Sequence, residues 1–175
     1  MENVSIETPR FILRSLTEED ATERYLGWMI DTVANRFIVS ARDTLSVADL
    51  RAFIAARIHR TDVLFLGIFL RDDGSHIGNI KYEPIRPAEG YAVMGLLVGD
   101  PNWRGKGVAG EVLAASINWL QEKFCLEEIL LGVDRNNEAA LRAYRSFGFR
   151  TLENDRLGIS SAQNMAMVFR LGTGL

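Results

Sequence analysis

The sequence predicts one α/β domain in which a mixed sheet carries helices on its faces. The chain has 175 residues, and a domain holds about 150 residues, so one domain over residues 1–175 is expected. Hydrophobic residues make up 47% and charged residues 25% of the chain, which is typical of soluble globular proteins and supplies a core. Short strand-like runs alternate with amphipathic helical patterns, and this alternation favours a sheet covered by helices.

The first third of the chain combines one strand with two helices. Residues 10–14 read as a short strand. Thr17 stands three residues before Asp20, and Ser46 stands three residues before Asp49; both pairs resemble helix N-caps. Apolar residues recur at helical spacing after the second pair. The expected elements are a strand at residues 10–14 and helices at residues 17–29 and 47–60.

The remaining two thirds alternate strands and helices. The turn signal at residues 72–75 separates two strand-like runs and predicts a hairpin. A loop with Pro84, Pro87 and Gly90 then leads to an apolar strand that stops at a Gly-Asp-Pro turn. The expected elements are strands at 62–71, 76–83 and 91–98, a helix at 107–124, a strand at 128–133, a helix at 137–147, and strands near 149–152 and 164–171.

Composition argues against several classes of protein. The longest apolar run, Val63–Leu70, has eight residues, whereas a membrane helix needs about 20. The acidic start of the chain does not resemble a signal peptide, so a cytoplasmic protein without membrane association is expected. Cys125, His59 and His76 are too few for a structural zinc site, so no metal is expected. His76 stands at the hairpin turn and is interpreted as a turn residue and not as a catalytic base. The net charge is −3 without long runs of like charge, which disfavours nucleic acid as a partner.

The most informative stretch is a glycine-rich loop, WRGKGVAG at residues 103–110, which precedes a predicted helix. Such a loop exposes backbone N–H groups beside the positive end of the helix dipole, and this predicts an anion site. A Walker A loop is disfavoured because glycine, rather than Ser or Thr, follows Lys106. Gly105, Gly107 and Gly110 match a dinucleotide fingerprint literally. However, six residues separate the strand from Gly105, and only 65 residues follow Gly110, which disfavours a nicotinamide-binding domain.

Two blocks carry a resemblance to a known family. Arg104, Gly107 and Ala109 satisfy the pattern Arg/Gln-x-x-Gly-x-Gly/Ala, and residues 137–149 follow N-x-x-A-x-x-x-Y-x-x-x-G-F. In both blocks the sequence resembles the GNAT superfamily of acyl-CoA-dependent N-acetyltransferases, and residues 105–111 look most like its RimJ/RimL-type branch. The resemblance implies a GNAT-like fold, with a central mixed, mostly antiparallel sheet and helices on both faces, over the whole chain.

The resemblance also implies acetyl-CoA as cosubstrate and a set of residues that bind it. The loop amides are expected to cradle the pyrophosphate, and the strand end before the loop, where family members bulge, is expected to offer main-chain groups to the pantetheine arm. Lys106 adds charge or is simply solvated, and Asn137 bonds the cofactor or simply caps its helix. The alternative is that residues 96–98 are ordinary strand residues of the core. The implied cofactor-binding residues are Leu96, Leu97, Val98, Arg104, Gly105, Lys106, Gly107, Val108, Ala109 and Asn137.

Tyr144 is the predicted catalytic residue. It follows Asn137 by seven residues, or about two helical turns, so both project from one helix face. A tyrosine with a pKa near 10 stays protonated at neutral pH and suits protonation of a departing thiolate; the alternative is an aromatic side chain that only packs. Many relatives carry a glutamate as general base where this chain has Val93. Glu83 and Asp134 are the remaining candidates, unless the amine enters already neutral.

The sequence thus predicts an N-acetyltransferase that moves an acetyl group from acetyl-CoA to a primary amine by direct attack. No motif identifies the acceptor, so a protein N-terminus, an amino sugar and another small-molecule amine all remain open. The alternative is a non-catalytic acyl-CoA-binding module, since Val93 cannot accept a proton. Monomer and homodimer both remain open.

Overall fold

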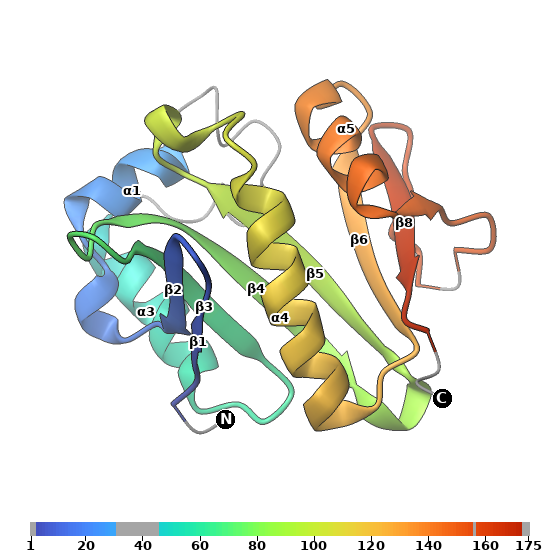
Figure 1. The fold of residues 1–175 in the computed structure, drawn as a ribbon, viewed down its shortest axis with the longest axis horizontal. Coiled ribbons are helices and arrows are strands. Elements are labelled where there is room, and N and C mark those ends of the chain that lie inside the picture. Colours follow the sequence, from blue (N-terminus) through green and yellow to red (C-terminus); the bar gives the residue numbers. More distant parts are fainter. Residues whose placement is uncertain (1–2, 31–45, 156, 173–175) are drawn as a thin grey trace.

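The computed structural model describes residues 3–30, 46–155 and 157–172. Within these ranges one eight-stranded sheet has the order β1-β2-β3-β4-β5-β6-β8-β7 (Figure 1). Neighbouring strands are antiparallel except β5 and β6, which are parallel. The predicted mixed, mostly antiparallel sheet is confirmed. The strands are β1 (Ser5–Glu7), β2 (Phe11–Ser15), β3 (Leu64–Leu70), β4 (His76–Arg86), β5 (Tyr91–Val98), β6 (Glu128–Asp134), β7 (Arg150–Thr151) and β8 (Asn164–Arg170), and the helices are α1 (Glu23–Ile30), α3 (Val47–Ile58), α4 (Val108–Phe124) and α5 (Glu138–Phe147).

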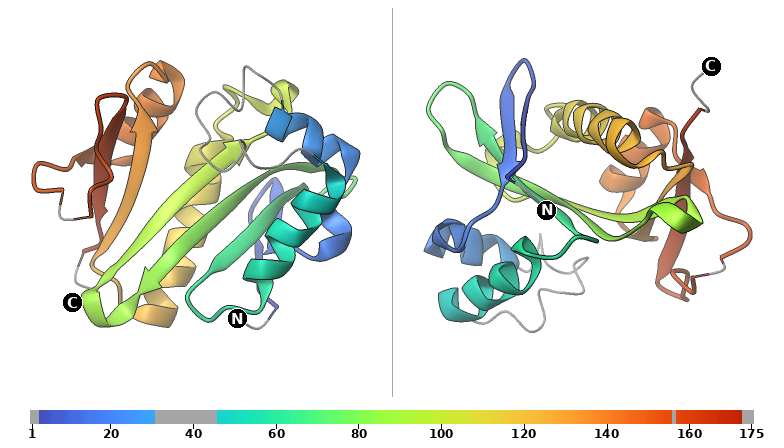
Figure 2. Two further views of the ribbon diagram at one scale, coloured as in Figure 1. Left: turned by 180° about the vertical axis from the view of Figure 1, so that it is seen from behind. Right: turned by 90° about the horizontal axis from the view of Figure 1, so that it is seen from below.

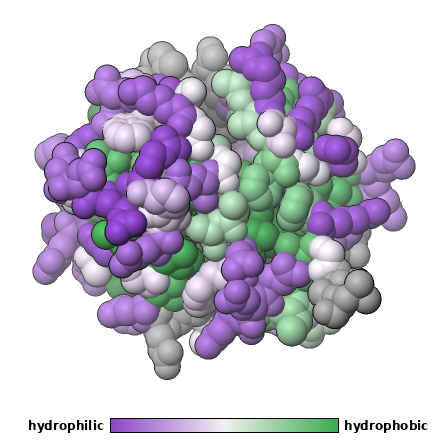
Figure 3. Space-filling view, viewed as in Figure 1, coloured by the Kyte–Doolittle hydropathy of each residue, from purple (hydrophilic) through white to green (hydrophobic). Residues whose placement is uncertain are grey.

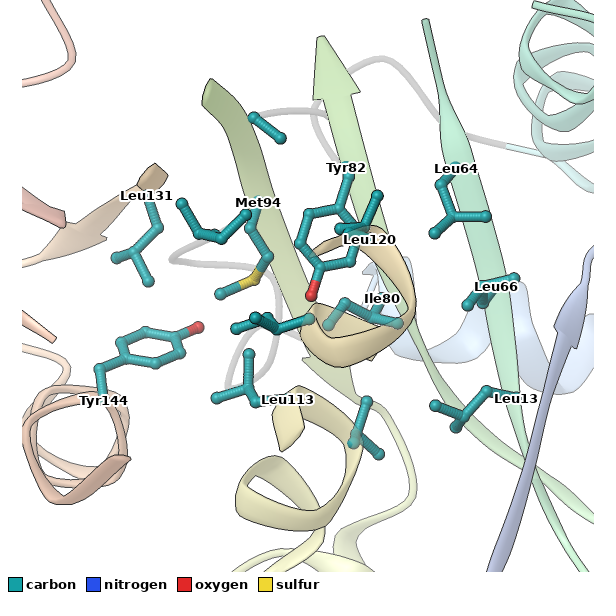
Figure 4. Close-up of a cluster of buried hydrophobic side chains, with 14 of the residues drawn as sticks. Leu13, Leu64, Leu66, Ile80, Tyr82, Met94, Leu113, Leu120, Leu131 and Tyr144 are labelled. Atoms are coloured by element: carbon teal, nitrogen blue, oxygen red, sulfur yellow. The ribbon is translucent and has the colours of Figure 1, made fainter. Parts of the chain in front are cut away.

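Helices cover both faces of the sheet, as predicted (Figure 2). The larger core lies between the sheet and α4 and α5; Figure 4 shows Leu113 of α4 and Tyr144 of α5 near Met94 of β5. A second, smaller core lies on the opposite face, where Leu50 of α3 and Tyr25 of α1 are buried. The sheet therefore separates two apolar layers, and each layer positions its own set of polar groups.

The two predicted N-caps have different outcomes. Ser46 caps α3 as predicted, because its hydroxyl accepts a backbone N–H at 3.1 Å. Thr17 and Asp20 form a capping box, but the box opens only a single 3₁₀ turn. Ala21 then leaves the helical region with a ψ of 84°, and α1 begins only at Glu23. The prediction of one helix from residue 17 was therefore wrong.

Strand β4 is longer than the sequence indicated, and β1 was not predicted. β4 continues through Pro84 to Arg86. Its register with β5 shifts between Tyr82 and Ile85, so Pro84 lies at an irregularity, where its missing N–H interrupts no regular ladder bond. The predicted loop begins only at Pro87, in a 3₁₀ turn. β1 has three residues, which are too few to show strand alternation.

Strands β5 and β6 pair over only part of their lengths. The Cα partners are Tyr91–Val93 and Glu128–Leu130, although β5 continues to Val98 and β6 to Asp134. Figure 1 shows the two strands separating toward the end of the sheet where α4 begins and α5 lies. In the described part of the chain, residues 94–98 of β5 have no strand partner on the side that faces away from β4. We call this side the open edge of β5.

Candidate functional site

The open edge presents the main-chain groups of alternate residues. The Gly99 N–H donates to the Ile77 carbonyl at 2.9 Å, and Leu97 lies two residues back on the same antiparallel ladder. Because hydrogen-bonded and non-bonded pairs alternate along such a ladder, Leu97 directs its main-chain groups at β4. Leu96 and Val98 direct theirs at the open edge. Two of the three predicted strand residues therefore face the space between β5 and β6.

The ladder around these residues is regular, which corrects the expectation of a bulge there. Residues 96–98 pair without interruption with residues 78–80. The irregularity lies instead between Tyr82 and Ile85, opposite Val93. Val93 is also the last residue of β5 that pairs with β6. Sheet distortion and strand separation thus begin at the same residue.

The glycine-rich loop leaves a run of backbone amides without partners. Gly105 and Gly107 have left-handed φ values of 72° and 73°, which favour glycine, and Gly107 is the N-cap of α4. Within the described part of the chain, the amides of residues 105–110 donate no hydrogen bond. A Cβ atom at Gly105 or Gly110 would meet nothing within 4 Å. These amides are unpartnered at the positive end of α4, as in an anion site.

Arg104 and Lys106 have different places in this loop. Arg104 donates from Nε to the Val98 carbonyl at 3.1 Å and from Nη2 to the Gly99 carbonyl at 2.7 Å. Its side chain therefore ties the loop to the end of β5 and leaves the Val98 N–H, rather than the carbonyl, for a ligand. The exposed Lys106 side chain lies over Trp103, with Nζ 5.5 Å from the ring centroid.

Asn137 caps α5 with its side-chain oxygen, and its side-chain nitrogen stays unbonded in the described chain. Its Oδ1 accepts the Ala140 N–H at 3.2 Å, as the helix-cap interpretation predicts. Its side-chain amide nitrogen donates no hydrogen bond within the described part of the chain, and the residue is half-buried. Capping and cofactor binding are therefore compatible, because they use different atoms of one side chain.

Tyr144 lies in the main core, with its ring centroid 5.6 Å from that of Phe149. Figure 4 shows its hydroxyl pointing from α5 toward Met94 and Leu113. The hydroxyl makes no hydrogen bond within the described chain. No fully buried side-chain polar atom of the described residues lacks a partner, so this hydroxyl is not completely enclosed although the residue is buried. Burial of the residue raises the pKa of Tyr144 to about 12, and the group stays protonated at neutral pH.

The surroundings of the open edge are apolar. Leu96 and Val98 pack partly buried against the main core, whose buried members include Val133 of β6 and Leu141 of α5. The space-filling view of this face shows apolar surface beside α4, on the side of α5 and β6, flanked by hydrophilic side chains (Figure 3). A ligand at the open edge therefore meets an apolar wall with polar amides at the loop end.

Neither predicted base candidate is a free carboxylate. Glu83 accepts hydrogen bonds from Lys81 at 2.7 Å, Arg57 at 2.8 Å and Arg60 at 2.6 Å. Burial alone raises the pKa of Glu83, but the hydrogen bonds from Lys81 and Arg57 outweigh it and hold this pKa below its usual range. Asp134 is buried at the end of β6 and accepts from the Asn136 N–H at 2.7 Å and from Gln163 Nε2 at 2.9 Å.

His76 opens β4 instead of lying in the turn. Its ring stacks on Phe69 with centroids 4.6 Å apart and meets Tyr25 and Trp28 edge-on. Its Nε2 lies 2.9 Å from the Gly78 carbonyl, so this nitrogen carries the proton. Burial lowers the pKa of His76 to about 4. The interpretation as a turn residue was wrong, because the side chain belongs to an aromatic cluster under α1.

Sequence reasoning missed a contact between the N-terminal segment and the loop. Glu111, in the first turn of α4, accepts from the Thr8 hydroxyl at 2.6 Å, the Arg10 N–H at 2.9 Å and Arg10 Nε at 2.7 Å. Arg10 Nη1 also donates to the Lys106 carbonyl at 2.9 Å. No local signal reveals these contacts, because about a hundred residues separate the partners.

The described residues contain neither a cluster suited to a metal ion nor a membrane-spanning helix. No group of three or more His, Cys, Asp or Glu side chains among them has the arrangement of a metal site. None of their helices is long and apolar enough to cross a membrane.

Comparison with known proteins places this geometry in a family. A family model described as "Acetyltransferase (GNAT) domain" matches residues 10–150. The uncharacterized N-acetyltransferase YoaA of Bacillus subtilis (strain 168) is 25% identical over 147 residues, which cover 83% of this chain and 82% of that protein. The family match includes the loop, the open edge and α5.

Solved structures share the whole fold at low sequence identity. The structure of RimL, a ribosomal L7/L12 alpha-N-protein acetyltransferase, in complex with coenzyme A has a TM-score of 0.80 at 15% identity, with 96% of this chain and 98% of that one covered. The Microcin C7 self immunity acetyltransferase MccE in complex with acetyl-CoA and AMP has a TM-score of 0.77 at 17% identity, with 94% of each chain covered. The predicted fold is therefore confirmed.

Proposed function

We propose that this chain moves the acetyl group of acetyl-CoA directly to a primary amine. The chain belongs to the GNAT acetyltransferase family and is an acetyl-CoA-dependent N-acetyltransferase. The proposal rests on the Tyr144 hydroxyl, which makes no hydrogen bond in the described chain and is directed toward Met94 of β5. A thiolate that leaves at this point needs a hydrogen-bond donor, and this hydroxyl supplies one.

Acetyl-CoA lies along the open edge in this proposal. The amides of residues 105–110 bind its pyrophosphate, because they are unpartnered and stand at the positive end of α4. The pantetheine arm bonds the main chain of Leu96 and the N–H of Val98. The side-chain nitrogen of Asn137 donates to the cofactor from the opposite side, while its oxygen caps α5.

The transfer step uses no covalent enzyme intermediate. The amine nitrogen attacks the thioester carbonyl carbon, a C–N bond forms, and the C–S bond breaks with its electron pair moving to sulfur. The pKa of Tyr144 is about 12, whereas that of a thiol such as cysteine is about 8.5. Complete proton transfer from Tyr144 to the departing thiolate is therefore unfavourable. Tyr144 therefore stabilises the developing thiolate as a hydrogen-bond donor. The nitrogen loses one proton to solvent as the amide forms, and the CoA thiolate takes up one proton from solvent, so no net proton is released.

We infer that the amine enters neutral, since Glu83 is held by three cations and Val93 packs in an apolar cluster with Leu130. A peptide N-terminus has a pKa of about 7.7–8.0 and is partly neutral at physiological pH, whereas a lysine side chain has a pKa of about 10.4. This favours a low-pKa acceptor, a protein N-terminus or an amino sugar, over a polyamine. Gly95 is exposed, and a Cβ atom added there would meet nothing within 4 Å, which leaves room for the approach of the amine.

The test uses acetyl-CoA with a panel of primary amines of graded pKa, and it measures CoA release between about pH 6 and 10. We expect kcat/KM to rise with pH and its midpoint to follow the pKa of each amine. One fixed midpoint for all amines would identify an enzyme base and overturn neutral entry. If no amine in the panel releases CoA although acetyl-CoA binds tightly, the transfer proposal is overturned.

One observation favours a second function, a non-catalytic acyl-CoA-binding module. Val93 occupies the position where a base is common in the family, and its side chain packs against Tyr91 and Leu130. In that case acetyl-CoA binds and stabilises the protein, but Tyr144→Phe changes nothing that can be measured. The amine panel therefore separates the two functions directly.

A further inference from the structure

The glycine-rich loop carries a charge that opposes its proposed ligand. Glu111 lies in the first turn of α4, immediately after the unpartnered amides of residues 105–110. Burial raises the pKa of Glu111, but the hydrogen bonds from Thr8 and Arg10 outweigh burial and hold this pKa below its usual range. The carboxylate is therefore ionised at neutral pH. An uncompensated carboxylate this close to a bound pyrophosphate weakens binding by like-charge repulsion.

Arg10 compensates this charge. Its Nε donates to Glu111 Oε2 at 2.7 Å, and its backbone N–H donates to Oε1 at 2.9 Å. The Thr8 hydroxyl completes the set at 2.6 Å. The Glu111 side chain is 17% exposed, so the ion pair is less screened than a surface pair. The carboxylate is thereby turned toward the N-terminal segment and neutralised there.

Arg10 also fixes the orientation of one loop amide. Its Nη1 donates to the Lys106 carbonyl at 2.9 Å. A trans peptide is planar, and its C=O and N–H point in opposite directions. A carbonyl of Lys106 held toward Arg10 therefore turns the Gly107 N–H away from Arg10, toward the side where the loop amides are open.

We propose that Arg10 is a positioning residue for acetyl-CoA: it neutralises Glu111 and aims the Gly107 N–H, so that the loop is organised for pyrophosphate before the cofactor arrives. This inference rests on the proposed function, because it assumes that the loop binds the pyrophosphate. It adds a residue that lies outside both motifs and reaches the loop only through the fold.

The chain offers a matched control in Arg14. Arg10 directly precedes β2 and Arg14 lies within it. Their side chains are both 39% exposed, and each forms a 2.7 Å ion pair. Arg14, however, pairs with Asp20 and stacks over Phe69, in the layer under α1. A general loss of stability affects both variants alike, whereas a loss of loop geometry affects only one.

The experiment compares acetyl-CoA with S-acetylpantetheine, which has the same thioester but lacks the pyrophosphate. We expect Arg10→Gln to raise KM for acetyl-CoA about tenfold, the effect of losing charge-assisted hydrogen bonds, and to change kcat/KM for S-acetylpantetheine less than about twofold. Arg14→Gln should leave the ratio between the two donors unchanged. Equal losses with both donors, or no change with acetyl-CoA, overturn the inference.

A second variant isolates the charge of Glu111. In the Arg10→Gln background, Glu111→Gln removes the uncompensated carboxylate, so KM for acetyl-CoA should recover about threefold. A purely structural clamp predicts a further loss instead, and that result also overturns the inference. If Arg10→Gln does not fold, Arg10→Lys replaces it: lysine keeps the charge but cannot bond Glu111 and Lys106 together, and a KM rise of about threefold is expected.

The wild-type protein distinguishes this inference from the proposed function. If the wild type shows no preference for acetyl-CoA over S-acetylpantetheine, the loop does not bind pyrophosphate, and the proposed cofactor pose fails together with the inference. If the wild type prefers acetyl-CoA and Arg10→Gln keeps that preference, only the inference fails.

Discussion

The two faces of the sheet use their polar groups in opposite ways. Around the open edge of β5, the amides of residues 105–110 and the Tyr144 hydroxyl have no partner in the described chain. On the face under α1 and α3, charged groups are bonded to one another: Glu83 alone accepts from Arg57, Arg60 and Lys81. The groups around the open edge leave donors unpartnered, whereas Glu83 and the three cations around it bond one another.

This difference explains why the glycine-rich loop can be recognised in the sequence. A site made of backbone amides needs glycines at fixed spacing and a helix start, and both are local features. A site made of side chains from separate elements needs no particular spacing, because the fold alone brings the groups together. The glycine-rich loop and α5 therefore carry motifs, whereas the charged groups under α1 and α3 carry none.

The largest expected effect contrasts two tyrosines of the main core. Tyr144→Phe should lower kcat by about 10²-fold or more, because the developing thiolate loses its donor, while CoA binding stays within about twofold. Tyr82 bonds Ser116 at 2.8 Å, so Tyr82→Phe should cost about 1 kcal/mol of unfolding free energy and leave kcat unchanged. Steady-state kinetics and urea unfolding of both variants check this. Equal kcat values would remove Tyr144 from the mechanism.

The second prediction concerns His76, whose burial lowers its pKa to about 4, against about 6.5 in an unfolded chain. Between these values the unfolded chain binds a proton that the folded chain does not, so stability falls as pH decreases. The loss is at most about 3 kcal/mol. Urea unfolding at several pH values should show it in the wild type but not in His76→Phe.

His59 provides the control for that measurement. It is the exposed C-cap of α3, and His59→Gln should keep the pH dependence of the wild type. If His76→Phe and the wild type lose stability in parallel on acidification, the histidine is not neutral in the folded state, and the aromatic cluster does not control it.

His76 also shows where prediction from sequence ends. Most helices and strands were predicted to within a few residues, because amphipathic periodicity and caps are local. The environment of His76 depends on Phe69 from β3 and on Tyr25 and Trp28 from α1. No pattern around residue 76 records these neighbours, so a hairpin histidine was misread as a turn residue.

The candidate site divides in the same way. Gly107, Asn137 and Tyr144 could be proposed from the sequence because each belongs to a local motif that resembles the family's. Glu111 was missed, because its partner Arg10 lies 101 residues away. The separation of β5 from β6 was also invisible, since a strand's sequence does not state where its pairing stops. Sequence thus suggests the groups proposed to contact the cofactor more readily than the groups that hold them in place.

The third prediction tests whether the carboxylate of Glu83 is structural. Glu83→Gln removes the acceptor of three cations, and we expect a loss of about 2 kcal/mol of unfolding free energy, between the values for exposed and buried pairs, with kcat within about twofold of the wild type. The lowered pKa of Glu83 means that its contribution is present above the unfolded value and is lost as pH falls through the folded one. The variant should therefore lose less stability than the wild type on acidification. A kcat loss of about 100-fold would instead identify Glu83 as the base.

The smallest expected effect compares one substitution on the two faces. Gly107 has a φ of 73°, so Gly107→Ala strains the loop by about 1 kcal/mol and should weaken CoA binding about fivefold to tenfold. Its Cβ would lie 3.8 Å from Arg10 Nη2, an ordinary contact, so strain rather than collision is responsible. Gly27 lies inside α1, where a Cβ would meet nothing within 4 Å; Gly27→Ala should add about 0.5–1 kcal/mol of stability and leave CoA binding unchanged. Calorimetric titration and thermal unfolding check both. Opposite signs are expected because glycine is needed where the backbone itself binds the ligand and is a cost where it only completes a helix.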